Sequence, residues 1–136
     1  MDNAARITRL VLPGLTNRHG SLFGGIALSL MDEAAGIVAT RAARGPVVTA
    51  HIESVDFKAP IWQNEAIVVT ADLQSVGTSS MHIRVETWAE CLEKGTRRHC
   101  TTAGFVMVAI DASGRPRPIP AESREAEEEP EDGPDA

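Results

Sequence analysis

The stretch NRHGSLFGGIALSLMDEAAGIV, residues 17–38, decides the fold of this chain. It begins as a polar loop and becomes an apolar segment whose large side chains recur at helical spacing. The pattern predicts a helix over residues 24–43, which ARGP at 43–46 ends with a glycine and a proline. Alanine and glycine occur on several sides of this helix, which indicates that other structure encloses it.

The segments around this helix predict five strands separated by turn residues. Short turns such as EKGT at 93–96 join antiparallel neighbours. We therefore expect an α+β fold, in which one five-stranded antiparallel sheet wraps around one long central helix. The open edge of such a sheet favours pairing with a second copy, so a homodimer is expected. The predicted strands are 6–12, 47–60, 65–77, 79–92 and 97–111.

Charge divides the chain into a body and a tail. The net charge is −6 over 136 residues, but residues 121–136 hold eight acids and one arginine, a net of −7, which leaves +1 for residues 1–120. We expect one domain over 1–120 and a disordered acidic tail over 121–136. The near-neutral body argues against nucleic acid as a partner.

Other sequence features exclude several classes of protein. No apolar run is long enough to span a membrane, and the N-terminus lacks the basic and apolar regions of a signal peptide. Cys91 and Cys100 make neither a disulfide framework nor a zinc motif. We therefore expect a cytoplasmic protein with no membrane partner, no metal and no cofactor.

Asp32 lies about two turns inside the apolar helix, where a carboxylate is costly unless it has partners or faces a cavity. Gly24 and Gly25 leave backbone N–H groups open at the positive end of the helix, where they can stabilise a developing oxyanion. A nearby carboxylate can act as a general base or as a nucleophile, and the Asn17 amide can place a water or a carbonyl. These are the parts of an acyl-transfer hydrolase without a GxSxG motif.

Each of these residues also has an ordinary structural explanation. Asn17 fits a turn or cap, the Gly24-Gly25 pair fits close packing, and Asp32 fits a buried acid bonded to the backbone. Glu33 points away from Asp32, because adjacent side chains diverge on a helix. The combination at this spacing is more specific than any single residue.

The segment NRHGSLFGGIALSLMDEAA, residues 17–35, resembles the signature of hotdog-fold acyl-CoA thioesterases. The most similar type is the cytosolic (brain-type) acyl-CoA hydrolase with its single-domain bacterial relatives. The resemblance continues through VVTAHIESVDFKAPIWQNE, VGTSSMHIRVETW and FVMVAIDASGRPRPIP, and so covers about residues 6–120. It implies a hotdog fold, hydrolysis of acyl-CoA to a free acid and CoA, and a dimer as the active unit, often within a hexamer of three dimers.

The resemblance also implies roles for individual residues. Asp32 would activate water, Asn17 would assist from the opposite subunit, and the backbone at Gly24 and Gly25 would polarise the thioester. A further set would run beside the pantetheine and nucleotide of CoA: Val55, Phe57, Lys58, Gly77, Thr78, Ser79 and Ser80.

Three cations are candidates to meet a CoA phosphate: Lys58, Arg115 and Arg117. Ordinary surface charge is the alternative explanation for all three. Phe23 departs from the family pattern, because many relatives carry histidine there, and this bears on substrate range. We expect structural roles for His19 and His51.

Two other functions compete with the thioesterase. A hotdog 3-hydroxyacyl-thioester dehydratase would need a catalytic histidine loop of the H-F-P type, which this sequence lacks. A non-catalytic acyl-CoA sensor or binder is the second alternative, although Asn17 and Asp32 favour catalysis. The sequence leaves open the acyl chain length, the role of the tail, and the choice between attack by water and a covalent anhydride at Asp32.

Overall fold

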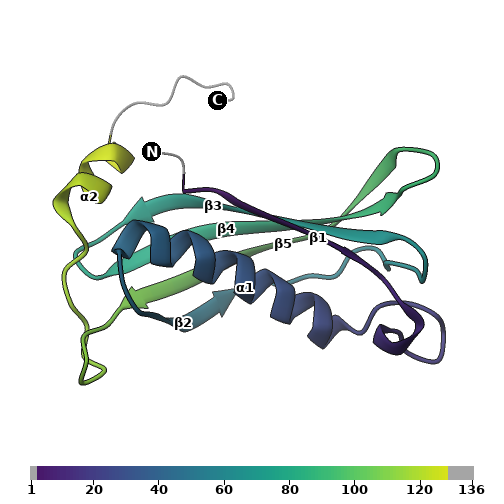
Figure 1. Ribbon diagram of the computed structural model, residues 1–136, viewed down its shortest axis with the longest axis horizontal. Helices are drawn as coiled ribbons and strands as arrows, with labels where there is room; N and C mark the ends of the chain where they lie inside the picture. Colours follow the sequence, from purple (N-terminus) through teal and green to yellow (C-terminus); the bar gives the residue numbers. More distant parts are fainter. Residues whose placement is uncertain (1–2, 129–136) are drawn as a thin grey trace.

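The computed structural model describes residues 3–128, and of residues 125–128 only the backbone. It contains a five-stranded antiparallel sheet and one long helix, which confirms the expected α+β architecture (Figure 1). No helix among these residues is long and apolar enough to cross a lipid bilayer. The elements are β1 (Ala5–Leu10), the 3-10 helix η1 (Pro13–Leu15), α1 (Gly24–Ala43), β2 (Val47–Glu53), β3 (Ala66–Val76), β4 (Ser80–Cys91), β5 (Thr96–Ala109) and α2 (Ala121–Glu128).

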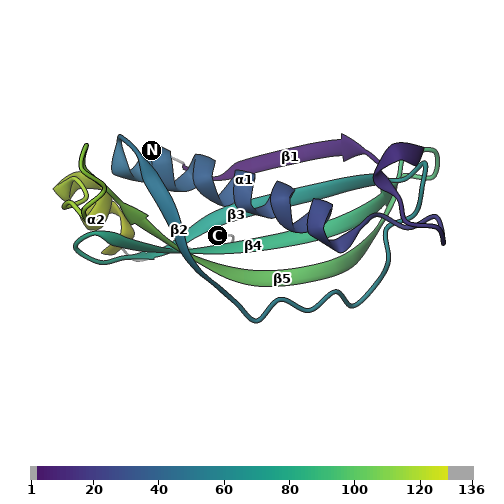
Figure 2. The same ribbon diagram turned by 90° about the horizontal axis from the view of Figure 1, so that it is seen from below.

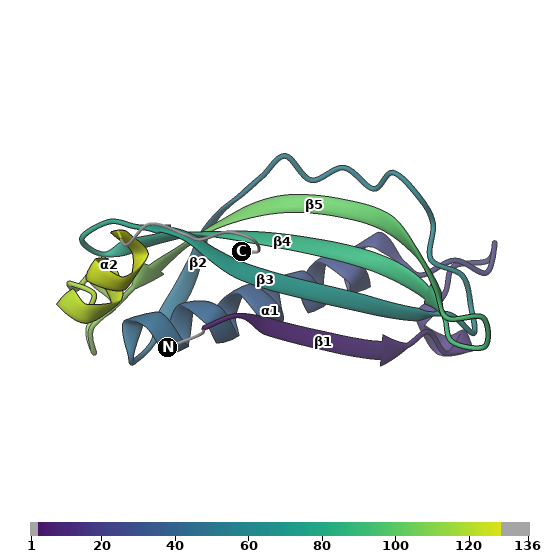
Figure 3. The ribbon, with the colours of Figure 1, turned by 90° about the horizontal axis from the view of Figure 1, so that it is seen from above.

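Strands β1 and β2 form the two edges of the sheet, whose order is β1-β3-β4-β5-β2. Every neighbouring pair is antiparallel. Helix α1 connects the two edges along the chain and lies across one face of the sheet (Figure 2). From the opposite side the outer face of the sheet lies in front of α1, and the segment after β2 arches beyond β5 (Figure 3).

Helix α1 packs against the sheet through small side chains. They face inward-pointing residues of the strands such as Ile67, Met81 and Phe105. Alanine loses no side-chain entropy on burial and lets the helix approach the sheet closely. The buried residues of α1 are Ala27, Leu30, Met31, Ala34, Ala35, Val38, Ala39, Ala42 and Ala43.

The far side of α1 is open in a single protomer. Ser29, Glu33 and Thr40 are exposed there, while the sheet covers the opposite side of the helix. Because alanine and glycine occur on several sides of α1, the sequence shows little difference in hydrophobicity between the two faces of the helix. The helix therefore has one covered face and one uncovered face.

The strand expected over residues 47–60 ends at Glu53, while the other four lie within two residues of their expected bounds. Ser54 has a φ of 55°, a left-handed conformation that turns the chain out of the sheet. Residues 54–60 then run irregularly beside β5, to which the Lys58 N–H donates a hydrogen bond at the Cys100 carbonyl (2.9 Å). This segment carries several of the expected substrate-binding residues, and it is a loop.

Distant parts of the chain satisfy the carbonyl groups at the C-terminus of α1. Arg44 adopts the left-handed conformation and its N–H donates to the Thr40 carbonyl at 2.8 Å. The guanidinium of Arg117 donates to the carbonyls of Ala43 (2.9 Å) and Ile110 (3.0 Å), and Ser123 Oγ donates to the Ala42 carbonyl (2.7 Å). Helix ends need such partners, because their last carbonyls have none within the helix.

The tail begins with regular structure. Residues 121–128 form α2, where the sequence analysis expects disorder, and residues 129–136 lie outside the described part of the chain. Two side chains hold the start of α2: Ser123 bonds to the end of α1, and Arg124 Nη1 donates to the Ile119 carbonyl at 2.5 Å. A hydrogen bond to α1, which is distant in sequence, therefore helps to order α2, although the composition of this segment predicts disorder.

Arg117 and Arg115 make a matched pair for testing this arrangement. Replacement of Arg117 by alanine should lower the free energy of unfolding by about 1–3 kcal/mol, because it leaves partly buried carbonyls without donors. Arg115→Ala should change it by less than about 0.5 kcal/mol, since this side chain is exposed. Urea denaturation of both variants measures the difference, and equal effects would contradict the capping role.

A bidentate ion pair fastens the segment before β3 to β5. Arg98 Nη2 and Nη1 lie 2.9 and 3.2 Å from the two carboxylate oxygens of Glu65, and the Trp62 N–H donates to the same carboxylate at 2.8 Å. The hydrogen bond from Arg98 is the main cause that lowers the pKa of Glu65 from its ordinary value of 4.5. The same bond raises the pKa of Arg98.

The stability that this pair contributes should depend on pH. Because the folded-state pKa of Glu65 lies below its unfolded value, the contribution is fully present above about pH 4.5 and is lost as the pH falls through the folded pKa. We expect Glu65→Gln to cost about 1 kcal/mol at neutral pH and progressively less in acid. Urea unfolding across pH tests this, with Glu90→Gln, whose Arg97 contact is a longer 3.6 Å, as the control. A cost that does not vary with pH would argue against the ion pair.

Candidate active site

The N-terminus of α1 presents two open backbone donors. The Phe23 carbonyl accepts the N–H groups of Ile26 (3.0 Å) and Ala27 (3.1 Å), so these two amides are paired. Among residues 3–128 no acceptor is recorded for the N–H groups of Gly24 and Gly25, and both glycines are exposed. Two adjacent unpaired donors at the positive end of a helix suit an oxygen that gains negative charge.

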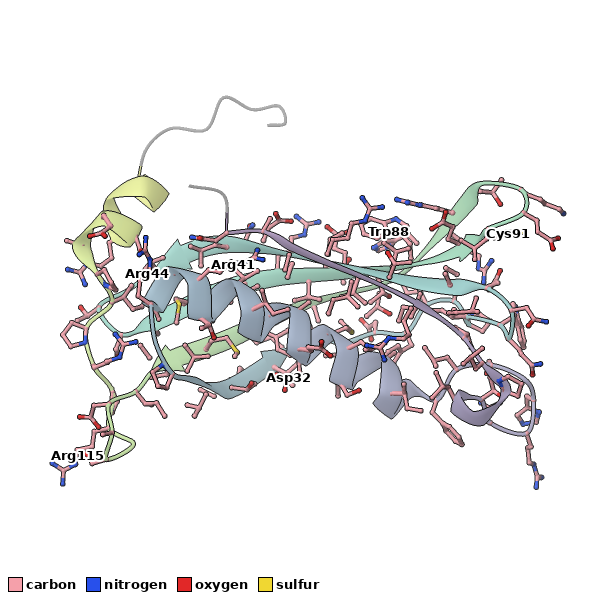
Figure 4. The ribbon with its side chains drawn as sticks, in the orientation of Figure 1. Asp32, Arg41, Arg44, Trp88, Cys91 and Arg115 are labelled. Atoms are coloured by element: carbon pink, nitrogen blue, oxygen red, sulfur yellow. The ribbon has the colours of Figure 1, made fainter. Side chains whose placement is uncertain are left out.

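Asp32 lies in the third turn of α1, on the side that faces β2, and is half-buried (Figure 4). Thr49 Oγ1 of β2 donates a hydrogen bond of 2.6 Å to Asp32 Oδ1. No partner is recorded for Oδ2 within the described residues, which leaves one oxygen available to take a proton. The hydrogen bond from the Thr49 hydroxyl and the partial access to solvent offset the unfavourable free energy of burying this carboxylate.

Thr49 is a candidate that the sequence did not predict. It lies beside a shift in the register between β2 and β5, which falls between Thr49 and His51. The contact between the edge strand β2 and the side of α1 is a tertiary contact, and no local sequence pattern predicts it. The sequence contains only an indirect signal for this contact. Asp32, an acid in an apolar helix, requires a hydrogen-bond donor, and the strand that follows α1 carries the hydroxyl of Thr49.

Within one protomer the two parts of the site are well separated. Asp32 lies eight positions after Gly24 along α1, which corresponds to about 12 Å at 1.5 Å per residue. An oxyanion donor must lie about 3 Å from the oxygen that it stabilises. The open amides and the carboxylate of the same chain therefore cannot serve one carbonyl together.

Asn17 organises the loop before α1. Its Oδ1 accepts the N–H groups of His19 (2.9 Å) and Ser21 (3.2 Å), and its Nδ2 donates to Ser21 Oγ (3.0 Å). These bonds give Asn17 the role in a turn that its sequence context also predicts, and one N–H of its amide stays available. No contact between Asn17 and Asp32 is recorded in the described part of the chain.

An apolar pocket of about 340 Å³ adjoins the open amides. Its walls come from the first turn of α1, the segment 54–60 and β5. The half-exposed ring of Phe57 lies beside Gly24, and Cys100 is buried on the other side. Burial raises the pKa of the Cys100 thiol, so it is neutral at physiological pH.

A larger cavity of about 590 Å³ lies between the segment 54–60 and the outer face of the sheet. Most of its lining residues are polar, and they carry both signs of charge, with Lys58 and Arg84 among the cations and Glu53 and Asp56 among the anions. Lys58 lines both cavities. Residues 3–128 contain no group of three side chains that could hold a metal ion.

The structure divides the other candidates into separate groups. Gly24, Phe57 and Lys58 meet at the apolar pocket, whereas the turn 77–80 contributes to neither cavity. That turn uses its backbone for structure: the Gly77 N–H donates to the Ser80 carbonyl, and the carbonyls of Thr78 and Ser79 accept from Ile119 and Ala109 respectively.

The remaining candidates lie away from this pocket. Val55 is half-buried and packs against the core. Arg115 extends from the end of the molecule opposite the open amides (Figure 4). Arg117 donates hydrogen bonds to the backbone carbonyls of Ile110, Ala43 and Pro118, which gives it a structural role at the end of α1. His19 and His51 are exposed and have no place in the core.

Comparison with known proteins identifies relatives of this fold. The model of the thioesterase superfamily matches residues 19–96. The chain is 41% identical over 122 residues to YkhA of Bacillus subtilis, which is named as an acyl-CoA thioester hydrolase. The aligned residues cover 90% of this chain and 71% of that protein. A hexameric acyl-CoA thioesterase superposes with a TM-score of 0.85 at 36% identity, over 93% of this chain and 85% of the other.

An acyl-CoA hydrolase of Staphylococcus aureus, solved with butyryl-CoA and CoA, superposes with a TM-score of 0.82 at 32% identity, over 88% of this chain and 73% of that chain. That enzyme has also been solved with an aspartate replaced by alanine, and with a threonine seventeen positions further on replaced by alanine. Asp32 and Thr49, which are hydrogen-bonded here, have the same spacing of 17 residues. The chain thus belongs to the thioesterase superfamily and has the hotdog fold of its acyl-CoA thioester hydrolases.

Proposed function

We propose that this protein hydrolyses acyl-CoA thioesters to a free carboxylic acid and CoA. The observation that carries the proposal is the Asp32 carboxylate, held through one oxygen by Thr49, in a chain that also leaves two helix N-terminal amides open. The relatives of this chain are named as acyl-CoA thioester hydrolases, which supports the same reaction. No histidine takes part in this arrangement, and this argues against the dehydratase alternative.

In the proposed reaction Asp32 acts as the general base. The free carboxylate oxygen takes a proton from water while the water oxygen bonds to the thioester carbon. The carbonyl oxygen gains negative charge and accepts hydrogen bonds from the N–H groups of Gly24 and Gly25. The carbonyl then reforms, the C–S bond breaks, and the proton held on Asp32 passes to the sulfur of CoA.

This site requires two subunits, because the amides and Asp32 of one chain are about 12 Å apart along the helix. We propose that Asp32 of one protomer faces Asn17 and Gly25 of its partner. The edge strand β2, which carries Thr49, is the proposed interface: five of its seven residues are exposed, and Val48 is 44% exposed. An unpaired strand edge is a surface on which a second copy can extend the sheet.

Assembly also bears on the recognition of CoA. Lys58 stands between the apolar pocket and the polar cavity, where a phosphate can meet it, whereas Arg115 and the turn 77–80 lie elsewhere. We propose that these last groups reach the CoA of a neighbouring protomer, within a hexamer of three dimers. Hexameric relatives support that number of subunits.

The same proposal places the protein in the cytoplasm and in fatty acid metabolism. It assigns no cofactor beyond the CoA of the substrate, no nucleic acid and no membrane partner. The near-neutral charge of residues 1–120 and the class of the relatives support it.

Replacement of Asp32 by asparagine tests the catalytic role. We expect kcat for acyl-CoA hydrolysis to fall by about a hundredfold or more, because the amide cannot accept the proton from water. Release of free thiol from acetyl-, butyryl-, hexanoyl- and palmitoyl-CoA measures turnover. Glu33→Gln, which changes the exposed neighbouring acid, is the matched control. An Asp32→Asn enzyme with wild-type kcat would refute the assignment, and binding without turnover by the wild type would favour the acyl-CoA binder.

Thr49 is a positioning residue, and its hydroxyl can be removed at constant shape. We expect Thr49→Val to lower kcat about tenfold or more with little change in KM, because a hydrogen bond to a charged group is lost. Thr49→Ser keeps the donor and should restore most of kcat. If valine and serine behave alike, the hydroxyl does not position Asp32.

A further inference from the structure

The register of the sheet shifts at three places, and each shift marks one extra residue: Ala50 of β2, Gln74 of β3 and Cys100 of β5. Such a β-bulge leaves the extra residue unpaired and interrupts the ladder of backbone hydrogen bonds. Cys100 is 1% exposed and belongs to the core, so packing accounts for its place. Ala50 is exposed and lies outside the core, so packing does not account for its place.

Strand β2 would be regular without Ala50. Thr49 stands opposite Met107, and His51 stands opposite Val106, which is the neighbouring residue of β5, so the pairs on both sides would form one continuous ladder. The alternation of side chains between the two faces of the strand would also be complete. The inward-facing residues would be those that already face inward, namely Val47, Thr49 and Ile52. Neither backbone pairing nor burial therefore requires the extra residue.

The residue directly before the bulge donates the hydrogen bond to the proposed base. Thr49 Oγ1 lies 2.6 Å from Asp32 Oδ1, a distance typical of a hydroxyl that donates to a carboxylate. A bulge bends its strand and increases the local twist, and this changes the direction of the side chains beside it. Because β2 is an edge strand, β5 is its neighbour in the sheet on one side, and the bend meets no second strand of the protomer.

We propose that Ala50 is a positioning residue: the bulge that it makes directs the Thr49 hydroxyl toward Asp32 and so holds the carboxylate that accepts the proton. The inference rests on the proposed thioesterase function and adds to it a residue that acts through Thr49. The backbone of Ala50 performs this role, because a bulge arises from the number of residues along the strand and not from the methyl group.

Deletion of Ala50 tests this role, since the shortened strand keeps the pairing and the inward-facing residues of β2. We expect kcat for butyryl-CoA to fall about tenfold with little change in KM, because a hydrogen bond to a charged group is lost. Ala50→Ser keeps the extra residue and should lose far less of kcat than the deletion does. Release of free thiol measures turnover, and circular dichroism verifies folding. A folded deletion enzyme with wild-type kcat would overturn the inference.

Deletion of Gln74 is the matched control. Gln74 is the extra residue between Leu73 and Ser75 of β3, it is exposed, and its removal likewise makes the ladder continuous. Two strands separate β3 from β2, so kcat of this variant should stay within about twofold of the wild-type value. An equal fall of kcat in both deletions would show a general effect of a shortened strand and would contradict the role of Ala50.

Combination with Thr49→Val separates positioning from any other effect of the deletion. If Ala50 acts through Thr49, its deletion from the Thr49→Val enzyme should lower kcat by less than about twofold, because the hydroxyl that it directs is already absent. Two losses that multiply, to about a hundredfold together, would show that the bulge acts by another route and would overturn the inference.

Two further measurements keep the inference testable if the deletion does not fold or if no turnover is found. Insertion of one more alanine after Ala50 enlarges the bulge and should also lower kcat, and a wild-type kcat there would count against the proposal. A double-mutant cycle of Thr49→Val with Asp32→Ala, measured by urea denaturation, should show coupling in the parent protein and none in the deletion or insertion variant. Coupling that persists in these variants would overturn the inference. If the wild type hydrolyses no acyl-CoA, the proposed function fails, and the cycle alone decides whether Ala50 positions Thr49.

Discussion

The close contact between the small side chains of α1 and the inner face of the sheet is the constraint on which the rest of the structure depends. Alanines such as Ala34, Ala35 and Ala39 are fully buried there and bring the helix axis near the strands. Because α1 connects the opposite edge strands β1 and β2, its placement also fixes the span of the sheet. The open amides then lie at one end of the helix, and Asp32 lies on the flank beside β2.

This placement divides the chemistry of the chain between two locations. The proposed donors to the oxyanion lie at the start of α1, and Asp32, the proposed proton acceptor, lies about 12 Å further along the helix. A helix cannot bring residues eight positions apart onto one carbonyl, so the proposed reaction requires a second copy of the chain. The exposed strand β2 beside Asp32 is the surface on which we propose that a second copy binds.

Several polar side chains stabilise the fold, although residues of these types often take part in catalysis or binding. Arg117 completes the C-terminus of α1, and Asn17 holds the loop that precedes it. Arg98 bonds both to Glu65 and to the Pro60 carbonyl, and so fixes the segment that borders the apolar pocket. The bonds of Asn17 and Arg98 thus hold the loop and the segment that border the open amides.

Local pattern in the sequence was sufficient to predict the long helix and four of the five strands. The helix over 24–43 was predicted to the residue, four strands were predicted within two residues, and Asp32 and Gly24-Gly25 stood out because a carboxylate and a glycine pair are unusual in an apolar helix. Periodicity and helix-end signals act over a few residues, so a sequence displays them directly.

Only the tertiary structure decided which groups meet. Thr49 reaches Asp32 across 17 residues, Arg117 reaches Ala43 across 74, and Ser123 reaches Ala42 across 81. The extra residue at Cys100, the early end of β2 at Glu53 and the open side of α1 likewise depend on how strands and helix pack. Such contacts arise from the three-dimensional path of the chain, which no local pattern contains.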